Sequence, residues 1–163
     1  MKPETLKELK EAARKIRVHI VTMIAASGSG HPGGSLSIAD IMSYLFFKEM
    51  NIDPSSPDDP DRDRFVLSKG HAAPVLYTAI AMKGYFPEDD LVTLRDIRSH
   101  LQGHPHRLDT PGVEASTGSL GQGFSMASGM AMGKKLSGSD ARIFVIIGDG
   151  ESQEGQIWET AMT

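Results

Sequence analysis

The sequence contains no cysteine among its 163 residues. This absence excludes a disulfide scaffold and a metal site built from thiolates. It also has no apolar run near the roughly 20 residues that a membrane-spanning helix needs. Residues 1–15, MKPETLKELKEAARK, are too charged for the apolar segment of a signal peptide. We therefore expect a cytoplasmic protein that does not engage a membrane.

The chain also lacks a strong charge of either sign. Its formal net charge is −4, and charged residues make up 23% of the sequence. A nucleic-acid-binding surface would require a basic excess, so no nucleic-acid partner is expected. Hydrophobic residues, at 39%, are sufficient for one ordinary globular domain.

The pattern of apolar residues predicts an α/β fold. Helical spacing recurs in the first segment, and the apolar run AxIFVII in residues 141–147 is typical of a strand buried on both faces of a parallel sheet. Ser37, with Asp40 three residues on, resembles a helix cap. The predicted helices cover residues 3–26, 37–46, 72–83, 87–95 and 120–136 and the chain from Gln153 onward, and the predicted strands cover 65–67 and 141–147.

The segment Gly148-Asp149-Gly150 follows the second predicted strand. The carboxyl ends of parallel strands are where such sheets bind ligands. Asp149 supplies the hard oxygen that Mg²⁺ or Ca²⁺ prefers, and the glycines would let a phosphate approach backbone N–H groups. The alternative is a tight turn capped by Asp149, with no ligand.

Three histidines stand beside glycine in predicted loops or at strand ends: His31, His71 and His104. Imidazoles in such places can bind sugar hydroxyls and transfer protons near neutral pH. A zinc site is the other functional interpretation, although the spacings match no zinc signature. The remaining histidines lack this glycine setting and are interpreted as structural: His19, His100 and His106.

The predicted helix at 120–136 is rich in small residues and is preceded by Gly118-Ser-Leu-Gly-Gln-Gly123. This turn is either an anion site at a helix start or a close-packing turn. It lacks the GxGxxG spacing of a dinucleotide site, which argues against a nicotinamide cofactor. Glycine in a helix costs about 1 kcal/mol relative to alanine, so we expect other backbone to lie close to these positions: Gly121, Gly123, Gly129 and Gly133.

Together, five segments resemble the N-terminal domain of the transketolase family: SGSGHPGG (27–34), LSKGHAAPVLY (67–77), GHP (103–105), PGVEASTGSLGQG (111–123) and GDGESQEG (148–155). Their common order makes the resemblance specific, and it extends over most of the chain. The resemblance implies a thiamine diphosphate-binding fold, with a three-layer parallel sheet that has helices on both faces. It implies that residues 1–163 form a single, partial diphosphate-binding domain, similar to separately encoded N-terminal subunits.

The resemblance also implies roles for individual residues. Asp149 would bind the metal, Mg²⁺ or Ca²⁺, that holds the diphosphate of thiamine diphosphate. His31, His71 and His104 would face the sugar and the reacting carbon, with His71 also near the cofactor. Glu154 would belong to an acidic network between the two active sites of a dimer. The implied cofactor contacts are His71, Gly118, Ser119, Leu120, Gly148, Gly150, Glu151 and Glu154.

The family's second metal ligand is an Asn further along the chain than Thr163, and its pyrimidine-binding and C-terminal domains are also missing from this sequence. We therefore expect thiamine diphosphate to bind weakly or not at all to this chain alone, and catalysis to need a pyrimidine-domain partner subunit. The implied reaction transfers a two-carbon ketol unit between sugar phosphates. Two alternatives remain open: part of an enzyme similar to 1-deoxyxylulose-5-phosphate synthase, or a non-catalytic assembly module.

Two structural expectations follow. The histidines at 31, 71 and 104 should converge on one cleft with Asp149. The chain should also associate with itself as a homo-oligomer, with its exposed apolar surface concentrated on the helix at 120–136 and at the C-terminal end.

Overall fold

The structure is a computed structural model that describes residues 2–163, and it divides into two compact units. Of the described residues, the first unit contains 2–50 and 71–103, and the second contains 51–70 and 104–163. Each unit draws on two separate stretches of the chain.

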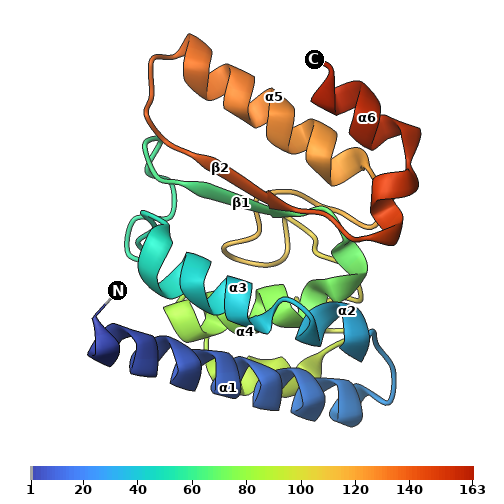
Figure 1. The fold of residues 1–163 in the computed structure, drawn as a ribbon. Coiled ribbons are helices and arrows are strands. Elements are labelled where there is room, and N and C mark those ends of the chain that lie inside the picture. Colours follow the sequence, from blue (N-terminus) through green and yellow to red (C-terminus); the bar gives the residue numbers. More distant parts are fainter. Residues whose placement is uncertain (1) are drawn as a thin grey trace. The chain divides into compact units, whose positions relative to one another are not determined.

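The first unit is helical and is built around one long helix, α1 (Pro3–Ser27), which packs against α3, α4 and η3 (Figure 1). The apolar positions that predicted this helix are buried, which confirms the interpretation of the 3.6-residue spacing. The other elements of the unit are α2 (Pro32–Leu36), α3 (Ala39–Tyr44), the π-helical turn η1 (Leu45–Glu49), α4 (Ala73–Lys83) and η3 (Glu88–Thr93).

Helix α4 is buried on nearly every side, so its sequence shows no amphipathic pattern. Gly84 ends it with φ of 105°, a left-handed conformation that glycine adopts without a steric penalty. A short 3₁₀ turn, η2 (Gly70–Ala72), precedes α4 and carries His71.

The predicted cap at Ser37 is wrong. Its hydroxyl donates to the carbonyl of Gly34 (3.0 Å), and Ile38 is the residue that precedes α3. The reason is that Pro32 fixes a helical φ and starts α2 inside a segment that its glycines predicted to be a loop. Ser37 therefore ends one helix and does not begin the next.

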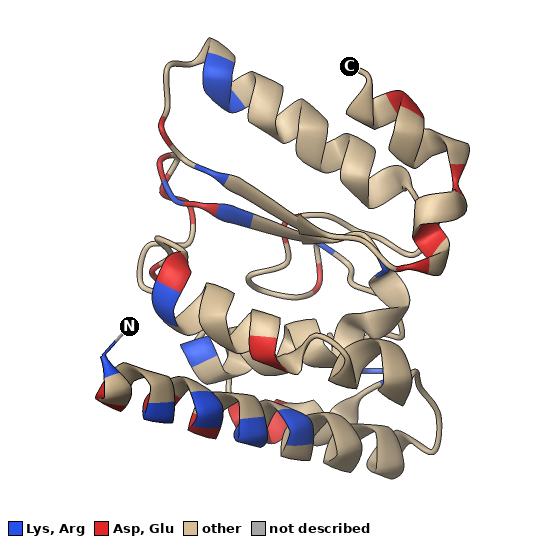
Figure 2. Ribbon diagram, viewed as in Figure 1, with Lys and Arg blue, Asp and Glu red and all other residues tan. Residues whose placement is uncertain are grey.

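From Glu4 to Arg17, helix α1 carries charges of both signs, whereas its C-terminal part has none (Figure 2). Glu11 and Arg14 form an ion pair there (2.7 Å). None of the helices in residues 2–163 is both long and apolar enough to cross a membrane.

The second unit contains a parallel two-stranded sheet made of β1 (Arg64–Leu67) and β2 (Ile143–Ile146). The register pairs Arg64 with Ile143 and Leu67 with Ile146, so both strands end at the same edge. Helix α5 (Gln122–Leu136) packs along the sheet and against α6 (Gly155–Ala161), as Figure 1 shows. The 3₁₀ turn η4 (Gly150–Gln153) joins β2 to α6. These elements confirm the α/β class and the parallel pairing.

Strand β2 is less enclosed than its sequence predicted. All four residues of β2 are half-buried, whereas three of the four residues of β1 are buried. Within the described residues β2 pairs with β1 alone, which leaves its other edge without a strand. The continuous apolar run therefore marks a strand that this chain covers only in part.

The amino ends of the two strands are held together by Asp63, a buried carboxylate. It accepts hydrogen bonds from the backbone N–H of Asn51 (2.9 Å), from the backbone N–H of Arg142 (2.8 Å) and from the Arg142 side chain (2.8 Å). Burial raises the pKa of this carboxyl, but these hydrogen bonds outweigh burial and leave the pKa below its ordinary value.

Glu114 makes a second charged junction in this unit. Its carboxylate pairs with Arg62 and with Arg64 (2.7 Å to the latter), and all three side chains are mostly buried. The pairs tie the loop before α5 to the start of β1, so part of the PGVEASTG segment has a structural role.

The glycines around α5 follow the predicted close packing only at its start. A Cβ on Gly123 would lie 2.6 Å from the Cα of Ser68, and a Cβ on Gly121 would lie 2.9 Å from the Cβ of Gln156. Gly129 and Gly133 have no such neighbour within 4 Å, so the expectation is wrong for these two within this chain.

Exposed large apolar side chains occur near α5 and the C-terminal end, but also elsewhere, so the predicted concentration holds only in part. The first group is Met126, Met132, Leu136, Trp158 and Met162, and the second includes Val18, Val21, Ile41, Val92 and Ile97.

Candidate cofactor site

The carboxyl ends of β1 and β2 bring two of the predicted motifs together. The ladder continues one residue past β1, because the backbone N–H of Ser68 donates to the carbonyl of Ile146, the last residue of β2 (2.9 Å). Ser68-Lys69-Gly70 and Gly148-Asp149-Gly150 therefore lie side by side at this edge. The position of each motif after an apolar run predicts this arrangement.

Asp149 is exposed at this edge, directly before η4. Its carboxylate is thus accessible to a cation, and hard oxygen is the correct donor for Mg²⁺. Within residues 2–163, however, no group of three or more His, Asp or Glu side chains could hold a metal ion. The chain fits a metal that takes one carboxylate here and its remaining ligands from a diphosphate, water and other protein groups.

Lys69 lies beside Asp149, and no sequence pattern marks it as a site residue. Its stem packs against Gly148, where a Cβ would lie 3.6 Å from the Cβ of the lysine. Burial lowers the pKa of the Lys69 ammonium, and the negative charges of Asp149 and Glu151 oppose this only in part. The Ser68-Lys69-Gly70 segment therefore places a lysine at the edge that carries Asp149.

Glu151, which the family resemblance placed at the cofactor, is buried with 2% of its surface exposed. One carboxylate oxygen accepts from the Ser68 hydroxyl (2.5 Å) and from the backbone N–H of Gly121 (2.8 Å). The other accepts from the backbone N–H of Gly148 (2.8 Å). Both oxygens are therefore engaged by the protein.

These bonds decide between the two interpretations of the Gly118–Gly123 turn. Gly121 is the residue that precedes α5, and the N–H of Phe124 in the first turn of the helix binds the hydroxyl of Ser68 (3.0 Å). The start of α5 is thus satisfied by Glu151 and Ser68, and the turn is a packing turn whose anion is a side chain of the protein.

Gly118 and His104 lie in direct contact within the same unit. A Cβ on Gly118 would lie 3.0 Å from Cδ2 of the His104 ring, and Gly118 has φ of 151°, which favours glycine. The backbone of Ser119 and Leu120 follows directly. The structure thus brings His104 of the GHP segment against the GSLGQG segment.

In the first unit, His31 and His71 lie close together, with ring centroids 5.3 Å apart. Gly34 lies against the second ring, since a Cβ there would be 3.3 Å from Nε2 of His71. The structure therefore brings together two of the three predicted histidines. Because His104 and Asp149 belong to the other unit, the convergence of all four residues stays a prediction.

The other histidines agree with their structural interpretation. Each forms a pair with a carboxylate: His19 with Glu88 (3.0 Å), His100 with Asp90 (3.2 Å) and His106 with Asp109 (2.8 Å).

Arg95 is a further residue of the first unit that sequence patterns did not reveal. Its φ of 68° makes it the sole non-glycine residue with positive φ in the described part of the chain. Its guanidinium donates to the hydroxyl of Ser29 (3.0 Å), two residues before His31, and it packs over Gly103. Such a strained backbone persists where surrounding contacts demand it.

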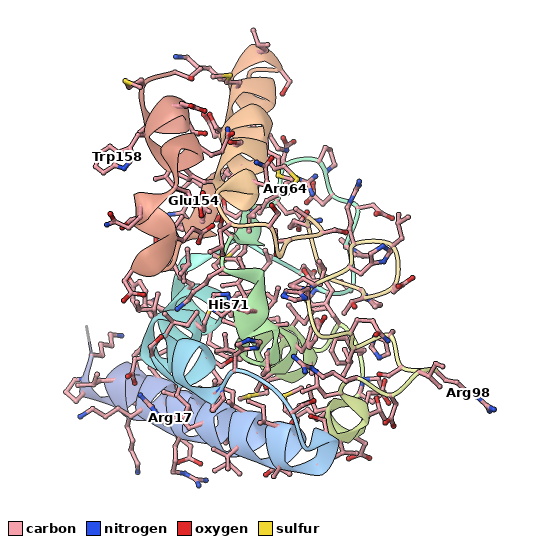
Figure 3. The ribbon with its side chains drawn as sticks, turned by 90° about the vertical axis from the view of Figure 1, so that its right-hand side faces the viewer. Arg17, Arg64, His71, Arg98, Glu154 and Trp158 are labelled. Carbon is pink, nitrogen blue, oxygen red and sulfur yellow. The ribbon has the colours of Figure 1, made fainter. Side chains whose placement is uncertain are left out.

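Glu154 is exposed at the start of α6, as is Trp158 one turn later (Figure 3). The resemblance implied a buried acid between two active sites. In this chain Glu154 has no such burial, so that role depends on a partner that covers it.

The fold and the strand-end carboxylate define a class of α/β domains that bind a ligand at the carboxyl edge of a parallel sheet. A family model described as "Transketolase, thiamine diphosphate binding domain" matches residues 8–163. The chain belongs to this family.

Among curated relatives, the 6-deoxy-6-sulfo-D-fructose transketolase subunit of Clostridium sp. (strain MSTE9) is 50% identical over 155 residues, which are 95% of this chain and 56% of that protein. An apulose-4-phosphate transketolase subunit of Actinobacillus succinogenes is 45% identical over 157 residues, 96% of this chain and 57% of that protein. Transketolase-like protein 2 of Bos taurus is 50% identical, and the match covers 25% of its length. The chain thus spans about half of the subunits and a quarter of the longer relative.

Solved structures of transketolases also superpose on this chain. A transketolase variant from Pichia stipitis superposes with a TM-score of 0.91 at 36% identity, over 95% of this chain and 24% of that one. The transketolase from Campylobacter jejuni superposes with a TM-score of 0.88 at 36% identity, over 98% of this chain and 26% of that one.

Proposed function

We propose that this chain is the N-terminal part of a transketolase that transfers a two-carbon ketol unit between sugar phosphates, using thiamine diphosphate and a divalent metal, Mg²⁺ or Ca²⁺. The observation that carries the proposal is the exposed Asp149 at the shared carboxyl edge of β1 and β2, in a chain that matches the thiamine diphosphate-binding family. Thiamine diphosphate, when bound, supplies the carbon nucleophile and the electron sink of the reaction.

In this proposal each residue of the site binds the metal or the cofactor, orients the reactants or transfers a proton. Asp149 binds the metal, and the N–H of Gly150, at the first position of η4, donates to the diphosphate. Gly148 lets the diphosphate come close to the backbone of the turn. Gly118, Ser119 and Leu120 line the side of the cofactor rings. His71 lies near the diphosphate, while His31 and His104 hydrogen-bond the sugar and transfer protons.

A partner subunit that carries a pyrimidine-binding domain would complete the site. Two relatives are named as subunits, and this chain covers little more than half of each. Because the present chain offers a single metal carboxylate, its own affinity for the cofactor should be low, and catalysis should require the partner. We place the assembled enzyme in the cytoplasm, as a homo-oligomer of such pairs.

The sugar could carry either of two anionic groups, since one relative is named for a sulfonated sugar and another for a phosphorylated one. The phosphorylated class is our proposal for this chain. The experiment co-expresses the chain with a subunit that carries a pyrimidine domain and follows transfer from phosphorylated and sulfonated ketoses to an aldose acceptor. We expect transfer from a ketose phosphate that depends on added thiamine diphosphate and Mg²⁺. A complex that binds no thiamine diphosphate would refute the proposal, and transfer from the sulfonated ketose alone would refute the substrate class.

A further inference from the structure

The carboxylate of Glu151 connects three segments that are far apart in the sequence. Its partners are the Ser68 hydroxyl after β1, the N–H of Gly121 before α5 and the N–H of Gly148 after β2, at 2.5–2.8 Å. Each belongs to a different motif of the candidate site. Ser68 extends the network, because its hydroxyl also accepts from Phe124 in the first turn of α5.

Glu151 is buried, and a buried polar group needs hydrogen bonds to offset its lost hydration. It obtains them from the hydroxyl of Ser68 and from the backbone N–H groups of Gly121 and Gly148, beside the positive end of the α5 dipole. A diphosphate could not take the N–H groups of Gly121 and Gly148 without displacing this side chain.

The bond to Gly148 also shapes the turn that carries Asp149. The side chain of Glu151 reaches back three residues to the N–H of Gly148, while the carbonyl of Gly148 accepts from the N–H of Ser152 (3.1 Å). The two bonds close the turn on itself, and Asp149 is left exposed at its tip.

We propose that Glu151 is a positioning residue: it fixes the Gly148–Gly150 turn to the start of α5 and the end of β1, and it does not contact the cofactor. This inference rests on the proposed function, because the position that it fixes is that of Asp149 and Gly150 toward a metal diphosphate. Loss of one of its acceptor oxygens should therefore weaken cofactor binding through the shape of the turn.

The test compares Glu151→Gln with the wild-type chain and with Glu159→Gln, which removes an exposed carboxylate from α6 as a matched control. Glutamine keeps the shape but offers one acceptor oxygen, so one of the three donors loses its partner. Amide hydrogen exchange is measured at Gly121 and Gly148, with Val66 and Tyr77 as reporters of the two units. Thiamine diphosphate with Mg²⁺ is then titrated into the wild type and each variant in complex with a pyrimidine-domain subunit, and binding is followed by calorimetry.

We expect Glu151→Gln to speed exchange at Gly121 or Gly148 at least about tenfold and to raise the Kd by about 10–100-fold, the range seen when groups that orient metal ligands are lost. Val66 and Tyr77 should keep wild-type exchange, and Glu159→Gln should match the wild type in every reading. Ser68→Ala provides a second variant if Glu151→Gln does not fold. It keeps the carboxylate but breaks the link to Phe124, and it should cause a smaller change in the same direction.

Two results would overturn the inference: weaker binding with unchanged exchange at both glycines, which would mean direct contact, or faster exchange with unchanged binding. A wild-type chain that shows no binding, even with a pyrimidine-domain subunit, would instead refute the proposed function. The two failures are therefore distinguishable.

Discussion

The rings of His31 and His71 lie 5.3 Å apart, and Gly34 leaves room for the second ring. We predict that Gly34→Ala displaces His71, because the new Cβ would lie 3.3 Å from both Nε2 and Cδ2 of the imidazole. Gly33→Ala is the control in the same helix, with nothing within 4 Å of its Cβ. The measurement is the NMR shift of the His71 ring protons. Equal shifts in the two variants would contradict the prediction.

Gly118 supports His104 in a similar way, but it also adopts a backbone conformation that favours glycine. Gly118→Ala should move the His104 ring, since the Cβ would lie 3.0 Å from it, and should destabilise the chain by about 1–2 kcal/mol through the positive φ. Gly138→Ala also places an alanine at a positive φ (70°), but with open space around it, so it is a control for positive φ without a contact. Denaturant unfolding and the NMR spectrum of His104 measure the two effects. If Gly138→Ala shifts the His104 signals as much, the contact does not matter.

The start of α5 should tolerate no added methyl group, whereas its middle should accept one. Gly123→Ala would place a Cβ 2.6 Å from the backbone of Ser68, so β1 or α5 must move, and we expect a loss of about 1–3 kcal/mol. Gly129→Ala meets nothing within 4 Å and should gain up to about 1 kcal/mol from helix propensity. Chemical denaturation of both variants provides the test, and a Gly123→Ala variant as stable as wild type would show that the packing at Ser68 is loose.

Asp63 should make the stability of the second unit depend on pH. Burial raises its pKa, but hydrogen bonds from Arg142 and from the N–H of Asn51 lower the pKa by a larger amount. The folded pKa therefore lies below the unfolded value of about 4. A depressed pKa contributes stability that is fully present above the unfolded pKa and is lost as the pH falls through the folded pKa. The contribution of Asp63 should thus be present at neutral pH and fade below about pH 4.

Asp63→Asn tests this contribution. It places an amide against donors and should cost about 1–3 kcal/mol at pH 7, with a smaller cost as the pH falls below about 4. Asp58→Asn changes an exposed carboxylate in the same loop and should leave stability unchanged. Denaturant unfolding at several pH values measures both variants. A cost for Asp63→Asn that is the same at pH 3 and pH 7 would contradict the assignment.

Much of the site could be predicted from the sequence because its motifs follow apolar runs. The run at 143–146 forms β2, and Gly148-Asp149-Gly150 therefore lies at a strand end. The same reasoning mispredicted the burial of β2. An apolar run indicates that a strand is to be covered on both faces, but this chain buries its four residues only in part. The glycine-rich pattern also predicted a loop where α2 forms, because Pro32 favours the start of a helix despite the two glycines that follow it.

The partners of Glu151 and Arg95 could not be predicted from the sequence for a different reason. Glu151 takes its partners from residues 68 and 121, and Arg95 takes its partner from residue 29. No local pattern encodes contacts at such separations. The family resemblance implied that Glu151 contacts the cofactor, and only the folded chain shows that Glu151 is buried among three donors of the protein.

The last prediction concerns association through α5 and α6. From Gln122 to Gly133 helix α5 carries no charged residue, as its uncoloured length in Figure 2 shows. A Cβ on Gly129 or Gly133 would meet nothing within 4 Å, and Met132 is 42% exposed beside a hollow of about 280 Å³ that α6 also lines. Such an uncharged, uneven face is typical of a partner surface.

Trp158 reports on association that also covers α6, because it is the sole tryptophan of the sequence and is 62% exposed on that helix. We expect light scattering to show association at micromolar concentration, together with a blue shift of Trp158 emission as its indole leaves water. Met132→Lys should abolish both changes, because a lysine would place a charge in the apolar contact. Ile41→Lys adds the same charge at a comparably exposed site on α3, in the other unit, and should leave association intact. A wild-type chain that stays monomeric on concentration would refute self-association, and equal effects of the two lysines would show that association does not use α5.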